Sequence, residues 1–303
     1  MATIAARTGV SSLSMILPAL LLAALVGGLA FTTGLIGNGH SGEMLPGPQI
    51  VIVAPRTFMY RSDGDFTKGG FPIDGPLLTV AVRAPLTIMK FQVSVADYTR
   101  CVVDGACAAA ENVRAGSDAV PVTGVNYDDA YAYAGWLSKK TGQVWRLPTD
   151  AEWAFAAGER FVDDGLGLAM DSRNPAIRWL ADYEREAARK GTGNPAPQPQ
   201  GTFGENAFGV ADIGGNVWEW TQTCHRRVNI GEDGAIASDV PACGIYVTEG
   251  KHRAPMSSFI RDPKSGGCSV GTPPDNLGFR LVHDSRWYAP LVRAFEIATG
   301  HGA

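Results

Sequence analysis

The stretch from Asp212 to Trp220 holds the residues of this chain best suited to bind a cation. It reads Asp-Ile-Gly-Gly-Asn-Val-Trp-Glu-Trp, so a glycine-rich turn separates one carboxylate from a second at Glu219. Carboxylate and backbone carbonyl oxygens are the ligands that a hard cation such as calcium prefers. The turn could bring Asp212 and Glu219 to one ion, with the intervening carbonyls as further ligands. The alternative is that the two tryptophans only fill the core and that Glu219 only makes hydrogen bonds.

The pattern around Glu219 predicts the element that positions it. Val217, Trp218, Glu219 and Trp220 alternate in character, which is typical of an extended segment. The two indoles then share one face, and Val217 and Glu219 share the other. Because the indoles are large and apolar, we expect them to anchor the core of the domain.

Three further segments accompany this stretch. They are residues 93–98 (Val-Ser-Val-Ala-Asp-Tyr), 146–153 (Arg-Leu-Pro-Thr-Asp-Ala-Glu-Trp) and 276–280 (Asn-Leu-Gly-Phe-Arg). Together with Gly-Asn-Val-Trp-Glu-Trp at 215–220, and in this order, they resemble the formylglycine-generating enzyme family of sulfatase-modifying factors. The resemblance implies that family's complex C-type-lectin-like fold, an α+β domain in which little of the chain is regular.

The resemblance also implies a calcium site. In relatives, one calcium is held by a carboxylate or amide before the Gly-Asn turn, by backbone carbonyls, and by the glutamate between the tryptophans. Mapped residue by residue, the implied ligands are Asp212, the carbonyls of Gly215 and Val217, and Glu219. A second family calcium would use residues 182–183, but no convincing partner aspartate follows them. Calcium at the first position is therefore the cofactor that we expect.

The copper centre of catalytic relatives is not matched. Those relatives bind copper(I) with two cysteines, four residues between them, and soft thiolates suit that metal. Counted back without gaps from Asn276, the two positions fall on His252 and Ser257. Because a serine cannot replace a copper thiolate, we expect no formylglycine generation by the family mechanism. The cleft that receives a peptide in catalytic relatives would then hold a protein or peptide partner.

Five cysteines suggest disulfides in an exported protein. Cys101 and Cys107 flank an Asp-Gly turn and predict a local disulfide. Cys224, Cys243 and Cys268 cannot all pair internally. One possibility is a Cys224–Cys243 disulfide that clamps a long loop and leaves Cys268 inert.

The other possibility is a redox or metal centre. It would combine His252 and Cys268 as candidate catalytic residues with Cys243 or Cys224, and it would use copper or iron.

The N-terminal region predicts export. Residues 1–11 carry one charged side chain, Arg7, and residues 12–37 carry none. Such a run exceeds the roughly 7–15 residues of a signal-peptide apolar core and suits a membrane-spanning anchor, although residues 28–30 could form a cleavage site. We expect a cytoplasmic stub, an inner-membrane anchor, a linker at 38–49 and a domain in the periplasm or exterior. If the segment is cleaved, the domain is secreted to the periplasm.

The family-like domain is expected at residues 50–285. Ser94 caps one helix, Gly142 ends a second, and Thr149 with Glu152 forms the capping box of a third, so Glu152 is a cap and not a base. Strands are expected at 50–53, 77–82, 88–93 and 144–147. Between them we expect a loop at 61–76, and after them an insertion at 161–200 with a helix near 176–190. An irregular polar stretch is expected at 221–244 and an amphipathic tail at 286–303.

Composition excludes one class of partner. The formal net charge is −4 and no dense basic run occurs, so nothing indicates nucleic acid. The 37 glycines and 19 prolines favour a loop-rich domain over a helical bundle. The five histidines are scattered, which argues against a non-haem iron enzyme of the sulfoxide-synthase type.

The leading interpretation is an exported, membrane-tethered, calcium-braced accessory or binding module. Residues 266–268 (Gly-Gly-Cys) and 273–280 look most like family members that are exported accessory proteins linked to nitrite reduction and denitrification. One alternative is an oxidoreductase with a divergent metal or thiol centre. Another is a subunit that docks into a larger membrane assembly through its tail and its membrane helix.

Overall fold

The computed structural model describes residues 44–111, 117–167, 176–177, 179–181, 183–184, 196–263 and 276–299. The expected stub and anchor, Asp182 of the second calcium site, and Cys268 lie outside the described residues. Residues 44–287 form one compact unit, and the tail from Tyr288 belongs to another. Across the described ranges, no helix is both long and apolar enough to cross a bilayer.

A four-stranded antiparallel sheet joins the two ends of the domain. Its strands, in order, are β1 (Ile50–Val53), β6 (Leu86–Met89), β12 (Val282–His283) and β7 (Trp145–Arg146). The first and last strands of the domain, β1 and β12, both pair with β6, so the chain closes on itself. Beside this sheet, β2 (Thr57–Arg61) and β5 (Leu77–Ala81) form a separate antiparallel pair.

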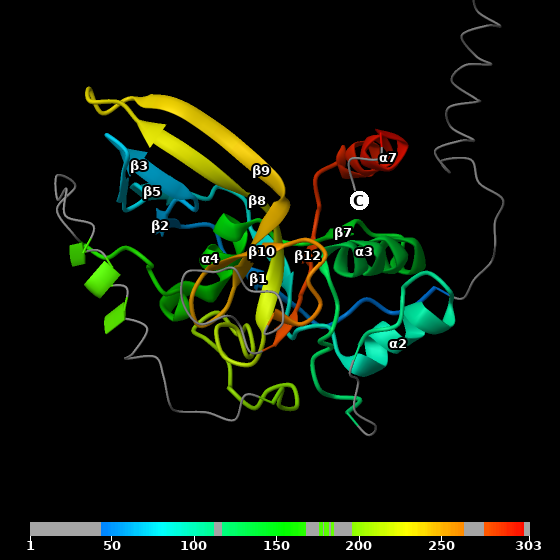
Figure 1. Ribbon diagram of the computed structural model, residues 1–303. Coiled ribbons are helices and arrows are strands. Elements are labelled where there is room, and N and C mark those ends of the chain that lie inside the picture. Colours follow the sequence, from blue (N-terminus) through cyan, green and yellow to red (C-terminus); the bar gives the residue numbers. More distant parts are fainter. Residues whose placement is uncertain are drawn as a thin grey trace, which may run out of the picture. The chain divides into compact units, whose positions relative to one another are not determined.

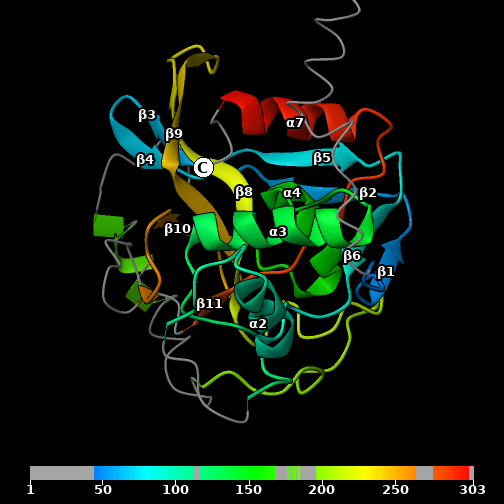
Figure 2. The same cartoon turned by 90° about the vertical axis from the view of Figure 1, so that its right-hand side faces the viewer.

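The largest sheet is organised around one long hairpin (Figures 1 and 2). Its path runs β10 (Ala254–Ser257), β9 (Ile236–Glu249), β8 (Trp218–Ile230), β3 (Asp65–Lys68) and β4 (Phe71–Ile73). The short strand β11 (Leu277–Gly278) pairs in parallel with the start of β8, with Gly278 opposite Glu219. The family-like segments at 215–220 and 276–280 are therefore neighbours in space.

Two sequence expectations were wrong here. The polar stretch 221–244 forms most of the β8–β9 hairpin, and the expected loop at 61–76 contains β3 and β4. The apolar signal is weak because residues 236–244 are largely exposed. The hairpin is instead held by backbone pairing, including the parallel ladder between β3 and β8, and by a disulfide described below. Sequence periodicity reports burial and cannot detect such pairing.

The helices begin where the capping residues predict. Helix α2 (Val95–Val103) begins after Ser94, whose hydroxyl accepts the Asp97 N–H. Helix α4 (Asp150–Ala157) has the predicted capping box of Thr149 and Glu152. Helix α3 (Tyr127–Thr141) ends at Gly142, which has a left-handed φ of 69°. These expectations are confirmed, because capping depends on residues within one turn.

The two indoles of the central motif anchor the core, as predicted. Trp218 and Trp220 lie in a cluster that includes Leu277, Phe279 and residues of α2 and α3. Trp220 is fully buried and donates its indole N–H to the carbonyl of Val125 at 3.1 Å. The opposite face of the strand is buried too, so Glu219 lies inside the domain.

Parts of the tail and of the insertion are helical. The tail forms α7 (Ala289–Thr299), in which Leu291 and Phe295, one turn apart, are exposed. The amphipathic character of the tail stays a prediction. Within the insertion, residues 176–177, 179–181 and 183–184 are helical.

Candidate functional site

Glu219 has a full set of hydrogen-bond donors around its carboxylate. Arg280 donates from Nε to Oε2 at 2.6 Å and from Nη2 to Oε1 at 2.8 Å. Gln92 Nε2 donates to Oε1 at 2.8 Å, and the indole N–H of Trp153 donates to Oε2 at 2.9 Å. Glu219 and Arg280 are fully buried. Each carboxylate oxygen therefore accepts two bonds, which is all that its lone pairs allow.

The hydrogen-bond donors of Arg280 are likewise all used. Besides its bonds to Glu219, its Nη1 donates to the carbonyls of Met89 (3.3 Å) and Lys90 (3.0 Å), and its Nη2 donates to that of Ala211 (3.0 Å). All five N–H donors of the guanidinium are used. The side chain therefore ties together the end of β6, the loop before the central turn, and β8.

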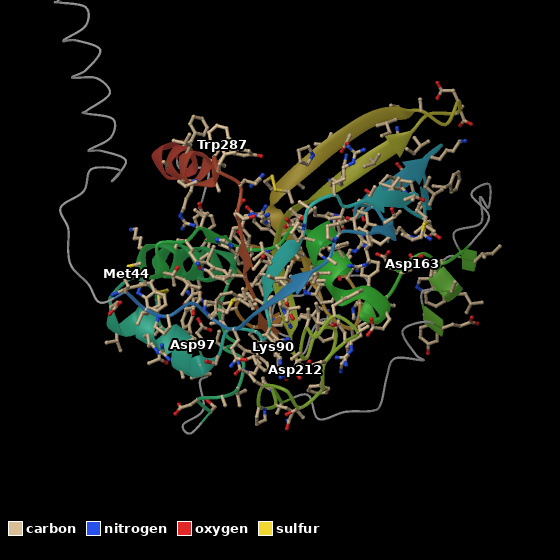
Figure 3. The ribbon with its side chains drawn as sticks, turned by 180° about the vertical axis from the view of Figure 1, so that it is seen from behind. Met44, Lys90, Asp97, Asp163, Asp212 and Trp287 are labelled. Carbon is tan, nitrogen blue, oxygen red and sulfur yellow. A yellow bond between two sulfur atoms is a disulfide. The ribbon has the colours of Figure 1, made fainter. Side chains whose placement is uncertain are left out.

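Asp212 holds a different part of the chain. Its Oδ1 accepts the backbone N–H of Phe203 at 2.8 Å, and its Oδ2 accepts that of Gly201 at 2.5 Å. Asp212 has a left-handed φ of 58°, a conformation that aspartate adopts more readily than most residues. Lys90 and Asp212 lie on neighbouring loops at one end of the domain (Figure 3), where the N–H of Ala211 bonds to the Lys90 carbonyl.

These residues do not fit the implied calcium site. Both oxygens of Glu219 are occupied and the cationic Arg280 lies against them, whereas Asp212 caps a loop with both of its oxygens. The turn places the N–H of Gly215 on the Asp212 carbonyl and buries Val217. In the described parts of the chain, no group of three or more His, Cys, Asp or Glu side chains could hold a metal ion.

The two positions that the resemblance assigns to the copper cysteines, His252 and Ser257, lie at opposite ends of β10. His252 precedes the strand, packs edge-on against Trp218 at 5.2 Å between ring centroids, and accepts the indole N–H with its carbonyl at 2.9 Å. Ser257 ends the strand opposite Ile245. An extended strand of four residues spans about 10 Å. β10 therefore separates the two positions.

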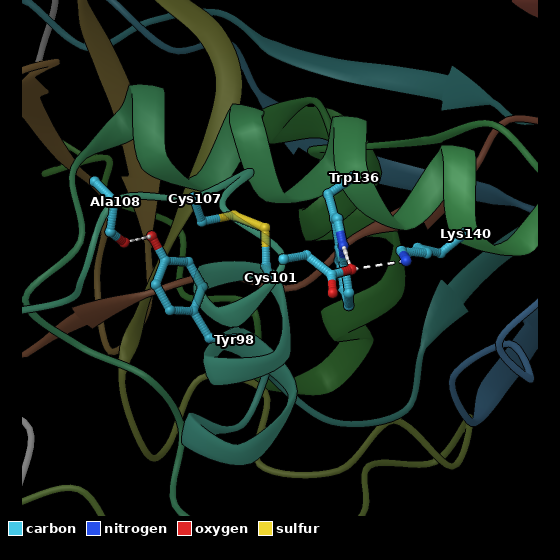
Figure 4. Close-up of a disulfide and its surroundings, with 7 residues drawn as sticks. Tyr98, Cys101, Cys107, Ala108, Trp136 and Lys140 are labelled. Carbon is cyan, nitrogen blue, oxygen red and sulfur yellow. Dashed lines mark hydrogen bonds and ion pairs between the residues drawn. A yellow bond between two sulfur atoms is a disulfide. The ribbon is translucent and has the colours of Figure 1, made fainter. Parts of the chain in front are cut away.

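The predicted disulfides are both present. Cys101 and Cys107 are bonded, with Cα atoms 5.3 Å apart (Figure 4). Cys224 and Cys243 join β8 to β9, with Cα atoms 4.8 Å apart. Because Cys224 and Cys243 are bonded to each other, neither can serve as a thiolate ligand beside His252 in this state.

The first disulfide lies in a small hydrogen-bonded cluster (Figure 4). Tyr98 donates its hydroxyl to the Ala108 carbonyl at 2.9 Å. On the other side, Asp104 accepts the indole N–H of Trp136 at 2.7 Å and pairs with Lys140 at 2.8 Å. These contacts link α2 to α3, so the cluster has a structural role.

A buried charged cluster around Arg253 is the feature that sequence reasoning missed. The Arg253 Nε lies 3.3 Å from a Glu249 oxygen and 3.6 Å from an Asp150 oxygen, and Nη1 lies 3.9 Å from Asp63. Tyr60 donates its hydroxyl to Asp150. Burial, followed by the neighbouring Asp150, raises the pKa of Glu249 well above its usual value. The four charged residues come from α4, β9 and two loops, so no local spacing reveals the cluster.

His225 extends this cluster toward the surface. Its Nδ1 lies 3.4 Å from buried Asp63, and its Nε2 lies 3.3 Å from exposed Asp65. Interaction with Asp63, then with Asp65, raises the pKa of His225 to about 9. The imidazole is therefore positively charged at neutral pH and links β8 to the start of β3.

The fold and the site define an α+β domain closed around a Trp-Glu-Trp strand whose glutamate is held by an arginine from the Asn-Leu-Gly-Phe-Arg segment. Residues 40–285 match the sulfatase-modifying factor enzyme 1-like domain. The chain belongs to this family, that of the formylglycine-generating enzymes.

Curated relatives include active and inactive enzymes. The formylglycine-generating enzyme of Mycobacterium tuberculosis (strain ATCC 25618 / H37Rv) is 38% identical over 120 residues, which is 36% of each chain. That of Streptomyces coelicolor is 29% identical over 173 residues, 54% of this chain and 53% of the relative. The inactive C-alpha-formylglycine-generating enzyme 2 of Mus musculus is 27% identical over 175 residues, 54% of this chain and 49% of the relative.

The matches to these relatives span between 36% and 53% of their length. Among solved structures, PvdO from Pseudomonas aeruginosa is similar to 78% of this chain and 94% of its own, with 23% identity and a TM-score of 0.49. Because the family contains inactive members, membership alone does not decide whether this chain is an enzyme.

Proposed function

We propose that this protein is a non-catalytic member of the family. It acts as an exported accessory or binding module for a protein or peptide partner, tethered to the membrane by residues 12–37. The observation that carries this proposal is that His252 and Ser257 stand where the catalytic relatives have their copper-binding cysteines.

Three further observations support the proposal. β10 separates His252 from Ser257, and the four cysteines in the described part of the chain are all in disulfides. Relatives named as inactive show that the fold is used without the family's catalytic activity. The two disulfides favour an oxidising location, which supports export to the periplasm or exterior.

An activity assay tests the loss of catalysis. The full chain, purified in detergent and loaded with copper(I), is incubated with a cysteine-containing sulfatase peptide, and formylglycine is sought by mass spectrometry. The Streptomyces coelicolor enzyme serves as the positive control. We expect conversion by the control alone, and conversion by this chain above the copper-only background would overturn the proposal.

Within the accessory class, we propose that the partner belongs to the nitrite-reducing machinery, a proposal that rests on the likeness of residues 266–268 and 273–280. The test is nitrite consumption by a deletion strain of the source organism. We expect nitrite consumption to fall and to be restored both by the full chain and by the His252→Ala/Cys268→Ser variant. Unchanged nitrite consumption in the deletion strain would remove the nitrite link and leave the accessory role to other partners.

The same double variant tests the oxidoreductase alternative. A divergent centre would need His252 and Cys268, so that variant would fail to restore function. Elemental analysis provides an independent readout. Stoichiometric copper or iron in the purified chain that is lost in His252→Ala would show a rebuilt metal centre and overturn the accessory proposal.

A further inference from the structure

The position of Arg280 brings a permanent positive charge to the centre of the family motif. Its Cα follows β11, which pairs with the start of β8, so the guanidinium meets Glu219 from the neighbouring strand. The two side chains form a bidentate pair with N–O distances of 2.6 and 2.8 Å and no solvent exposure. Arginine stays charged at every accessible pH and matches a carboxylate fork geometrically.

A calcium ion bound to Glu219 would compete with this pair. Calcium lies about 2.3–2.6 Å from its ligand oxygens. Because each Glu219 oxygen is also bonded to an Arg280 nitrogen, the ion and that nitrogen could be no more than about 5 Å apart, inside the protein. Like charges at that distance repel strongly in a buried environment. A shift of the guanidinium away from Glu219 would relieve this repulsion, and it would weaken the bonds of Arg280 to the carbonyls of Met89, Lys90 and Ala211.

Asp212 brings a second negative charge to the motif, but backbone N–H groups already engage its carboxylate. Gln92 is neutral, and its Nε2 presents N–H donors to the Glu219 carboxylate (2.8 Å) and to the Asp212 carbonyl (3.3 Å). Both carboxylate oxygens of Asp212 face the backbone N–H groups of Gly201 and Phe203. Arg280, Gln92 and Trp153 each direct a donor at Glu219, whereas the buried Oε1 of Gln92 has no hydrogen-bond partner. One neutral oxygen is far fewer than the six to eight oxygen ligands that calcium takes.

We therefore propose that the Arg280 guanidinium is the cation of this site, and that the domain folds and remains stable without calcium at Asp212 and Glu219. Five hydrogen bonds from one side chain link β6, the loop before the central turn, and β8, which is the bracing role that the resemblance assigned to a metal ion. This inference concerns the stability of the domain and does not depend on the proposed function.

Thermal unfolding with and without calcium tests the proposal. The full chain in detergent is stripped with EGTA, and its Tm is measured in EGTA and in excess calcium, with bound calcium determined by elemental analysis. A specific site filled at 100 times its Kd would raise the Tm by roughly 5–10 °C. We expect a difference below about 1 °C, which is too small for such a linkage, and no stoichiometric calcium.

Asp212→Gly is the test variant, because glycine suits the left-handed φ of 58° at this position and removes every side-chain oxygen that could bind calcium. We expect a fall in Tm that is equal in EGTA and in calcium, as for the loss of a loop cap. A calcium-dependent Tm in the natural protein that Asp212→Gly abolishes would overturn the proposal. Calcium bound equally by the natural protein and by the variant would lie elsewhere and would support Arg280 as the cation at Glu219.

Discussion

Replacing Glu219 with glutamine would remove the buried negative charge at the centre of the domain while keeping the size of the side chain. The substitution leaves no cavity, because the two side chains have nearly the same volume. It places one NH2 group where a carboxylate oxygen accepted two bonds, either from Arg280 and Gln92 or from Arg280 and Trp153. In either orientation two donors lose their acceptor, and a fully buried guanidinium loses its counter-charge. We expect the free energy of unfolding to fall by about 3–5 kcal/mol.

Glu152→Gln is the control, because Glu152 forms a similar bidentate pair with Arg146 at 2.6 and 2.7 Å. That glutamate side chain is 28% exposed, and a glutamine can still complete the capping box. We expect a loss of about 1 kcal/mol. Urea unfolding followed by tryptophan fluorescence gives both values by linear extrapolation. If the two variants lost the same free energy of unfolding within about 0.5 kcal/mol, the reasoning would be refuted, because it holds that burial, and not the geometry of the ion pair, sets the size of the loss.

Three further predictions concern the hairpin and its surroundings. Removing the Cys224–Cys243 disulfide with two serines should lower the free energy of unfolding by about 3 kcal/mol through loop entropy, since the bridge spans 19 positions, and denaturant unfolding would show it. His225 has a pKa raised to about 9 in the folded protein, above its value of about 6.5 when unfolded. The stability that it adds should therefore be complete below pH 6.5 and lost as pH rises through 9, and a His225→Gln variant should lack that slope in a pH series of Tm values. Gly250→Ala would place a Cβ 2.6 Å from the Trp218 ring, so we expect a loss of about 1–3 kcal/mol, and an unchanged urea midpoint would contradict this close approach.

The sequence by itself determined the features that depend on nearby residues. Ser94 and Thr149 mark helix starts because a cap and its partner lie within one turn. The Cys101–Cys107 bridge follows from a spacing of six residues around an Asp-Gly turn. The Trp-Glu-Trp alternation placed two indoles in the core and, with the other motifs, indicated the family. In each case the relevant atoms are close in the chain.

Only the tertiary structure decided what Glu219 contacts. Its partners Arg280 and Gln92 are 61 and 127 positions away in the chain, and the parallel pairing of β11 with β8 brings the first of them into place. The motif predicted oxygen ligands for a cation, and the fold places the guanidinium of Arg280 against the oxygens of Glu219. The charged cluster around Arg253 could not be predicted from the sequence either, because the burial of a charged side chain depends on residues that are distant in the chain.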